Sequence, residues 1–269
     1  MKMFNVIKAQ SYQIRRDNTT YYYIIGAFLF SIFMGLVILT DSGGGETDGS
    51  RWFVNVTSFS MSYLGNLFAL MFTARICGWD LQDRTLNYEL MNGCKRSSIY
   101  LGRVVLSLLW SLGIVYAVTV IPLAAVGLTK GWGDMISMGG VIRRLAMAAF
   151  PLIKMCCLYA LMTFLILDWR AVIAIGFVFG QIEMLAAMML NELSINVPKA
   201  VTECITAFAM NKILDCSNTA LGYKDGEDIV VIKDSFTAGQ LVPTLAVCAA
   251  GAVLYLILGY ALFRKRDLK

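Results

Sequence analysis

Charged side chains of both signs are concentrated in the segment 80–96, which lies between two long apolar stretches. Acidic residues stand near its start, at Asp80 and Asp83, and basic residues near its end, at Lys95 and Arg96. An α-helix carries partial positive charge at its N-terminus and partial negative charge at its C-terminus, so this order favours a helix. The pattern predicts a rigid polar helix that connects the two apolar stretches.

Apolar residues in the same segment, Leu86, Leu90 and Met91, are spaced so that they could enter a groove on a partner protein. A membrane protein that receives force from a soluble ATPase needs such a contact surface. The alternative is an ordinary solvated loop. We expect the segment to be a coupling helix.

Two charged residues lie inside apolar stretches. Lys154 precedes Asp168 by 14 residues, and Glu183 follows Arg170 by 13 residues. At about 1.5 Å per residue, both lie about 20 Å from the same turn, which makes them level in an antiparallel hairpin. Because unpaired charge in a bilayer is costly, an ion pair is expected. The pair is either part of a translocation path or structural, and both side chains could instead extend to the outer interface.

The sequence lacks the common catalytic patterns. It has no histidine, which removes the commonest general base and the commonest metal ligand. It also has no GxxxxGK[ST] phosphate loop, HExxH or GxSxG pattern, so the chain is not itself an ATPase. The seven cysteines include no CxxC pair, although Cys204 and Cys216 could form a disulfide in an oxidising space. We expect no catalytic residue, no metal and no cofactor bound by this chain.

The elements that position these residues are long apolar helices. Of the 269 residues, 58% are hydrophobic and 15% are charged, against about 25% charged residues in soluble domains. Apolar runs of about 20 residues predict membrane spans. The expected fold is all-α, a single transmembrane domain over residues 1–269. Its six spans are Thr20–Thr40, Val56–Ile76, Ile99–Leu128, Met147–Leu167, Ala171–Leu190 and Leu241–Phe263.

Three segments outside the spans have a predicted form. Residues 2–16 read as an amphipathic helix that lies in the membrane interface, and Asp17 can cap the helix that follows. Residues 129–146 are expected to be a loop or a re-entrant piece. The long segment 191–239 is expected to be extracellular, with a helix near Pro198–Asp215.

Lysine and arginine residues set the expected orientation. The net charge of +5 is typical of a membrane protein whose basic residues lie in cytoplasmic loops rather than on nucleic acid. Most of them flank the spans on one side, which places both termini and the segment 80–96 in the cytoplasm. Arg143 and Arg144 oppose this assignment, and the sequence assigns them no role.

The stretch 75–106 resembles the corresponding part of the ABC-2 type permeases, the membrane subunits of bacterial ABC exporters. Those proteins carry an acidic residue after the second span, a helix with paired hydrophobics, a small turn, a basic residue and an aromatic entry into the third span. Arg84 stands where the family often has glycine. The resemblance implies that the contact with the ATPase is made by Asp80, Asp83, Arg84, Thr85, Leu86, Glu89, Leu90, Lys95 and Arg96.

This resemblance, closest to permeases of the lantibiotic-immunity and bacitracin-efflux type, implies the function and the partners. The chain would be a permease in the bacterial cytoplasmic membrane, working with a second permease copy and a cytoplasmic ATPase dimer that binds ATP. Its cargo would be antimicrobial peptides or hydrophobic compounds. The alternatives are export of lipid or polysaccharide, and a membrane scaffold or sensor that docks a soluble partner through the same segment.

Overall fold

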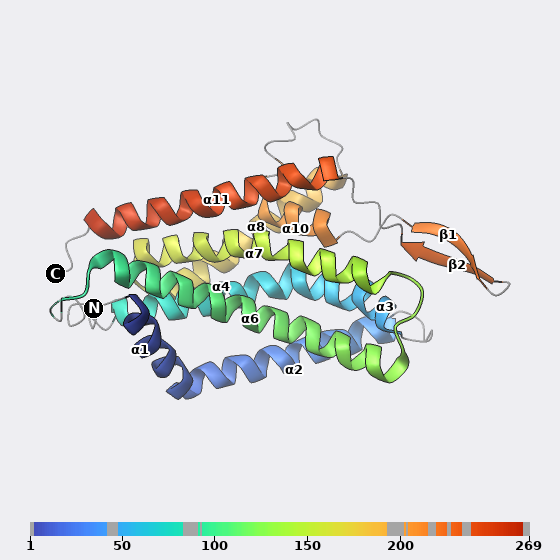
Figure 1. Ribbon diagram of the computed structural model, residues 1–269, viewed down its shortest axis with the longest axis horizontal. Helices are drawn as coiled ribbons and strands as arrows, with labels where there is room; N and C mark the ends of the chain where they lie inside the picture. Colours follow the sequence, from blue (N-terminus) through green and yellow to red (C-terminus); the bar gives the residue numbers. More distant parts are fainter. Residues whose placement is uncertain are drawn as a thin grey trace.

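Six long helices lie side by side in the computed structural model (Figure 1). The structure describes residues 3–41, 48–82, 91, 93–192, 202, 204–214, 219–224, 227–232 and 238–265. The long helices are α2 (Asn18–Asp41), α4 (Ser58–Gln82), α6 (Arg96–Lys130), α7 (Met138–Ile166), α8 (Trp169–Glu192) and α11 (Ala238–Lys265). The shorter elements are α1 (Met3–Arg16), α3 (Gly49–Trp52), the π-helix η1 (Phe53–Thr57), α10 (Thr206–Leu214), β1 (Thr219–Lys224) and β2 (Glu227–Ile232).

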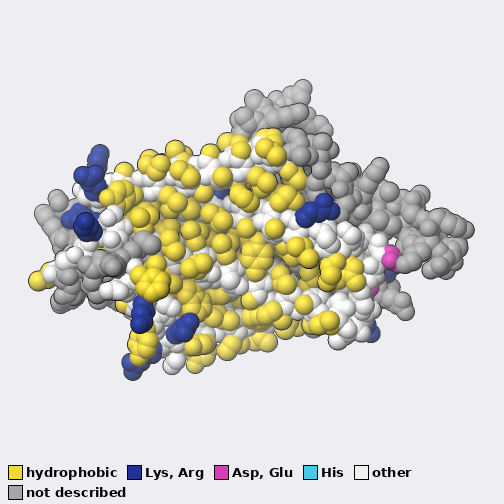
Figure 2. Space-filling model, viewed as in Figure 1, with side chains coloured by type: hydrophobic (Ala, Val, Ile, Leu, Met, Phe, Trp, Pro, Cys, Tyr) yellow, Lys and Arg dark blue, Asp and Glu magenta, His cyan; other side chains and the backbone are white. Residues whose placement is uncertain are grey.

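Four of these helices are long and apolar enough to cross a membrane, judged over the described part of the chain. The qualifying stretches are Arg96–Lys130, Met138–Ile166, Trp169–Ala187 and Leu241–Lys265. Apolar side chains cover much of the molecular surface between its two ends (Figure 2), where a water-soluble protein would present polar groups. The helical class of the bundle and its membrane character are therefore as the sequence predicts.

Helices α4 and α7 form the centre of the bundle. α4 packs against α6, α7 and α8, while α7 also packs along α11. Helix α1 crosses the start of α6 at a steep angle to the bundle (Figure 1), where Val6 contacts the backbone at Gly102. This end of the molecule carries exposed basic residues, and we call it the basic end. Its exposed basic residues, among those that the structure describes, are Lys8, Arg15, Arg16, Lys95, Arg170, Arg264 and Lys265.

The fourth predicted span, Met147–Leu167, begins nine residues after the start of the helix that forms it. Helix α7 starts at Met138, so most of the predicted loop or re-entrant piece 129–146 is helical. The Ser137 side chain caps the helix by accepting the backbone N–H of Gly140 at 3.1 Å. Arg143 donates to the Gly139 carbonyl of the same helix, and Arg144 is buried. The sequence prediction began the span after these two arginines because it relied on hydropathy, and charged residues lower the hydropathy of this part of the helix.

The predicted coupling helix 80–96 is not one continuous helix. Asp80 belongs to the last turn of α4, and Arg96 begins α6. Before α6 the chain turns at Gly93, whose φ of 79° favours glycine. Residues 83–90 and 92, the middle of the predicted helix, lie outside the described part of the chain.

The segment between α8 and α11 contains a feature that the sequence reading missed. Strands β1 and β2 pair antiparallel, with Lys224 opposite Glu227 and Thr219 opposite Ile232. They lie at the end of the molecule opposite the basic end (Figure 1). Within the helix predicted near Pro198–Asp215, the structure describes α10 over Thr206–Leu214, while residues 198–201, 203 and 215 lie outside the described part of the chain.

Candidate functional site

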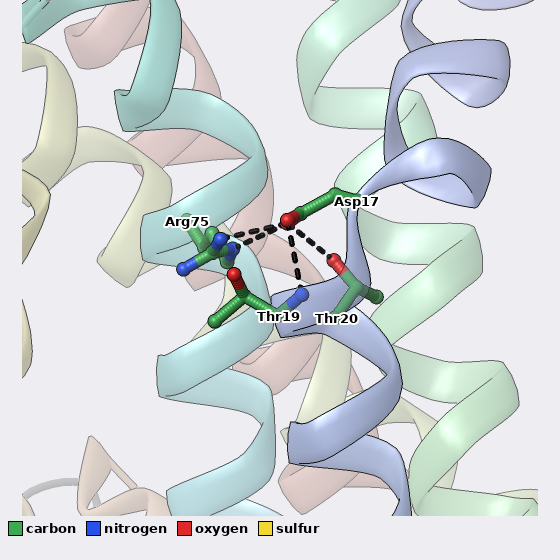
Figure 3. Close-up of polar contacts among 4 residues, drawn as sticks. All are labelled: Asp17, Thr19, Thr20 and Arg75. Atoms are coloured by element: carbon green, nitrogen blue, oxygen red, sulfur yellow. Dashed lines mark hydrogen bonds and ion pairs between the residues drawn. The ribbon is translucent and has the colours of Figure 1, made fainter.

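Asp17 joins three helices at the basic end. It follows α1 directly, and its carboxylate accepts the backbone N–H of Thr19 at 3.1 Å and the hydroxyl of Thr20 at 3.0 Å. These bonds cap α2, as predicted from the sequence. The same carboxylate forms an ion pair with Arg75 of α4, whose Nη2 lies 2.7 Å away and whose Nε lies 3.2 Å away (Figure 3). One carboxylate therefore fixes α1, α2 and α4 together.

Aromatic rings surround the Arg75 guanidinium. Its Cζ lies 4.3 Å from the ring centroid of Trp79 and 5.3 Å from those of Tyr23 and Trp169. Trp169 opens α8, so the contact extends to a fourth helix. Arginine suits this position because its planar cation can stack on rings and pair with a carboxylate at once. We call Asp17, Arg75 and the three rings the joint.

The joint lowers the pKa of Asp17. Burial of the carboxyl acts in the opposite direction and would raise the pKa. The hydrogen bonds from Arg75, Thr19 and Thr20, together with the positive charge of Arg75, outweigh burial because they stabilise the ionised form. The joint is thus a charged, hydrogen-bonded contact that is largely shielded from solvent.

The opposite half of the bundle contains a groove. It consists of a cavity of about 170 Å³ between α2, α4, α7, α8 and α10, and a wider neighbour of about 370 Å³ beside η1. The two share Ser62, Tyr63 and Asn211. A smaller cavity continues the groove between α4 and α8, past Asn66 and Gln181.

One face of η1 and α4 supplies a polar stripe along this groove. Asn55, Ser58, Ser62 and Asn66 recur every three or four residues, which is the spacing of one helical face. The stripe begins in the π-helical turn η1, a feature that often marks functional sites. Ser58 donates to the Val54 carbonyl and Asn66 accepts the Tyr159 hydroxyl. The stripe therefore leaves Asn55, Ser62 and the Asn66 amide N–H groups for contact with a polar molecule.

Helix α10 covers the groove and is held by two charged residues, the buried Lys154 and the half-buried Glu183. Lys154, with 3% exposure, donates from Nζ to the Cys204 carbonyl at 2.6 Å. Glu183 accepts hydrogen bonds from the backbone and side chain of Thr206, the first residue of α10. Lys212 of α10 donates to Thr244 of α11 at 3.0 Å.

The predicted partners Lys154 and Glu183 do reach the same level of the bundle. They interact through their charges, but these two described side chains form no direct ion pair. Both bind the segment 204–206 instead, which lies between them. Cys204 is an exposed free thiol, and its predicted partner Cys216 lies outside the described residues.

The predicted coupling residues are described only in part. Lys95 is exposed, and Arg96 donates to the Arg264 carbonyl at the end of α11 at 3.0 Å. Asp80 lies on α4, but its side chain is outside the described set. The remaining predicted contact residues, also outside it, are Asp83, Arg84, Thr85, Leu86, Glu89 and Leu90.

The sequence analysis assigned no role to the groove, and of the joint it singled out only Asp17, as a helix cap. The polar stripe of α4 was the available signal, because its residues recur at helical spacing inside an apolar stretch. The joint gave no such signal, since Arg75 lies 58 residues from Asp17. Within the described residues, no group of His, Cys, Asp or Glu side chains could hold a metal ion.

No protein-family model matches the sequence, and no curated protein matches it.

Proposed function

We propose that this chain is the membrane-spanning subunit of an ATP-driven exporter of the ABC-2 type. It clears amphipathic or hydrophobic compounds from a bacterial cytoplasmic membrane. The observation that carries this proposal is the groove, a recess with a polar stripe on one side and, on another, α7 and α8, two of the four helices that are apolar enough to span a bilayer. A protein that only anchors a partner has no use for such a recess.

In this proposal the chain crosses the bilayer six times. Helices α2 and α4 contain 24 and 25 residues, and about 20 residues suffice to cross the hydrocarbon. Both pack against α6, one of the four apolar helices. The basic end faces the cytoplasm, which agrees with the usual distribution of lysine and arginine.

Energy comes from a separate ATPase dimer that contacts the segment 80–96, and a second permease copy completes the transporter. The joint supports this arrangement. The last turns of α4, which lead into the segment, are tied through Arg75 to α1, α2 and the start of α8. A displacement of the segment is thereby passed to helices that line the groove.

The test is co-purification of the chain with its ATPase and measurement of vanadate-sensitive ATP hydrolysis. The variant Leu86→Asp with Leu90→Asp places charge on the apolar contact surface, which costs several kcal/mol. It should insert normally but lose both the partner and stimulated hydrolysis. The control is Leu128→Asp, at a residue of α6 that is 88% exposed and distant from the basic end. Retention of the partner and of stimulated hydrolysis by the double variant would mean that the segment 80–96 is an ordinary solvated connector.

Cysteine labelling tests the orientation. In a cysteine-free background, single cysteines at Gly44 and Lys224 should react with an impermeant maleimide in intact cells. A cysteine at Lys95 should react only after the membrane is opened. External labelling at Lys95 would contradict both the orientation and the ATPase contact.

A further inference from the structure

We propose that the groove binds uncharged amphipathic molecules that combine an apolar body with amide or hydroxyl groups. Transport of such molecules rests on the proposed function, whereas their binding to the chain does not. The inference follows from three properties of the groove: its apolar walls, its open hydrogen-bonding groups and the absence of charge from its described lining.

The walls of the groove suit an apolar body of variable shape. Phe30 and Phe177 supply flat aromatic surface from α2 and α8. Three methionines, Met155, Met184 and Met210, line the cavity from α7, α8 and α10. Methionine is flexible and polarizable, so it adapts to ligands of different shape.

The polar groups of the groove are available for a ligand. Ser62, Gln181 and Asn211 line it from three helices, and none of them forms a hydrogen bond with a described residue. The Asn66 side-chain oxygen accepts a hydrogen bond from the Tyr159 hydroxyl at 2.6 Å, so the amide N–H groups of Asn66 remain available to a ligand. Amide and hydroxyl groups both donate and accept, so they complement amides and hydroxyls on a ligand.

The same lining disfavours ligands that carry a charge. The described residues around the central cavity include no Lys, Arg, Asp or Glu. The nearby Lys154 donates to the Cys204 carbonyl, and Glu183 accepts from Thr206 although its Oε2 has no hydrogen-bond partner among the described residues; neither side chain lines the central cavity. An ionic ligand would lose its hydration here without meeting a counter-charge, which is strongly unfavourable. The groove therefore discriminates against cationic peptides as well as against anionic lipids.

The ligand reaches the groove from the bilayer. Phe30 is 44% exposed and Phe177 is 48% exposed, so both rings lie where the groove meets the molecular surface. Exposed apolar residues of the same two helices, such as Leu29, Phe33 and Val178, make that surface apolar, and it faces lipid in the proposed arrangement. A compound dissolved in the membrane can thus enter without crossing water.

The experiment uses photolabelling of the purified full-length chain in lipid nanodiscs, without an ATPase. The probes are dodecyl diazirines that differ only in their headgroup: N-methylamide, trimethylammonium or sulfonate. Mass spectrometry should find that the amide probe labels Met184 and Met210 at least about fivefold more than either charged probe, since open hydrogen bonds and desolvation both favour the neutral headgroup.

Two variants complete the test. Gln181→Leu with Asn211→Leu should reduce labelling by the amide probe about fivefold for each side chain, because each loses one hydrogen bond. The control is Val178→Leu, at a residue of α8 that is 57% exposed and lies outside the groove lining. Equal labelling by all probes, or unchanged labelling in the double variant, would overturn the inference. Selective labelling without stimulated ATP hydrolysis would refute the exporter function alone.

Discussion

The joint and the groove lie in opposite halves of one bundle and use polar groups in opposite ways. In the joint, a full ion pair is enclosed by aromatic rings and hydroxyl donors, so its polar groups satisfy one another. In the groove, uncharged side chains face an open space and leave hydrogen-bonding capacity unused. The first arrangement stabilises a contact between helices, while the second keeps a site ready for another molecule. Substitutions should therefore change stability at the joint and binding at the groove.

The largest effect is expected from Arg75→Met. It removes the cation from the rings and leaves the Asp17 carboxylate with only Thr19 and Thr20. Breaking a buried ion pair costs about 3–5 kcal/mol. The midpoint of thermal unfolding in detergent should fall accordingly, and amide-probe labelling below that temperature should persist.

Two variants act as controls for this effect. Arg75→Lys keeps the charge but loses the planar contact with Asp17 and the stacking, so it should melt between the wild type and Arg75→Met. Arg143→Met makes the same change at an exposed arginine and should cost less than about 0.5 kcal/mol. Equal melting of Arg75→Met and Arg143→Met would show that the joint adds no stability.

The next effect concerns the attachment of α10. Lys154→Met removes the donor to the Cys204 carbonyl and leaves Glu183 without its neighbouring positive charge. Glu183→Gln removes the negative charge but keeps an acceptor for Thr206. Because the two charges interact, the double variant should cost less than the sum of the single variants by about 0.5–3 kcal/mol. Thermal unfolding of all four proteins measures the difference, and strictly additive losses would contradict the coupling.

A smaller effect on stability is expected at the hydrogen bond between Tyr159 and Asn66 in the groove wall. Asn66→Leu leaves the buried Tyr159 hydroxyl without its acceptor, at a cost of about 1–3 kcal/mol. Adding Tyr159→Phe should recover most of this stability, because neither polar partner then remains. Labelling by the amide probe should stay reduced in both proteins, since both lack the Asn66 amide. Recovery of labelling together with stability would mean that Asn66 serves structure alone.

The helices themselves were predictable because their signal is local. Each of the six predicted spans lies within a long helix or its immediate flank, and the turn at Asp168 begins α8 as expected. A run of apolar residues reveals a helix without knowledge of its neighbours. The exceptions are Arg143 and Arg144, which lie in α7 although hydropathy excluded them.

The strand pair also had a local signal in the sequence, which the prediction did not use. Asp-Gly, here at positions 225 and 226, is a frequent turn sequence in β-hairpins.

The candidate site was less predictable because its contacts join distant parts of the chain. Helical rise placed Lys154 and Glu183 at one level, but it could not show that the segment 204–206 would lie between them. Likewise, the capping role of Asp17 follows from its neighbours, whereas its pairing with Arg75 depends on how α4 packs. Interactions along one helix follow from sequence spacing, and interactions between helices require the fold.

The smallest effect is the dependence of the joint on pH. The folded protein lowers the pKa of Asp17 below its usual value, so the ionised carboxylate is favoured in the folded state. The resulting stabilisation is complete above the pKa of the unfolded chain, about 3.9. As the pH falls further, the unfolded chain binds its proton first, and the stabilisation is lost as the pH passes through the lowered pKa of the folded state.

Asp17→Asn isolates this effect because the asparagine amide cannot titrate. The difference in thermal midpoint between the wild type and Asp17→Asn should be constant from about pH 7 to about pH 5 and should shrink as the pH approaches about 3. It should stay below half of the shift caused by Arg75→Met, because the carboxyl keeps some access to solvent and the amide oxygen of the variant can still accept the bonds that cap α2. A difference that grows in acid would mean that the protonated form of Asp17 is the one that the joint favours.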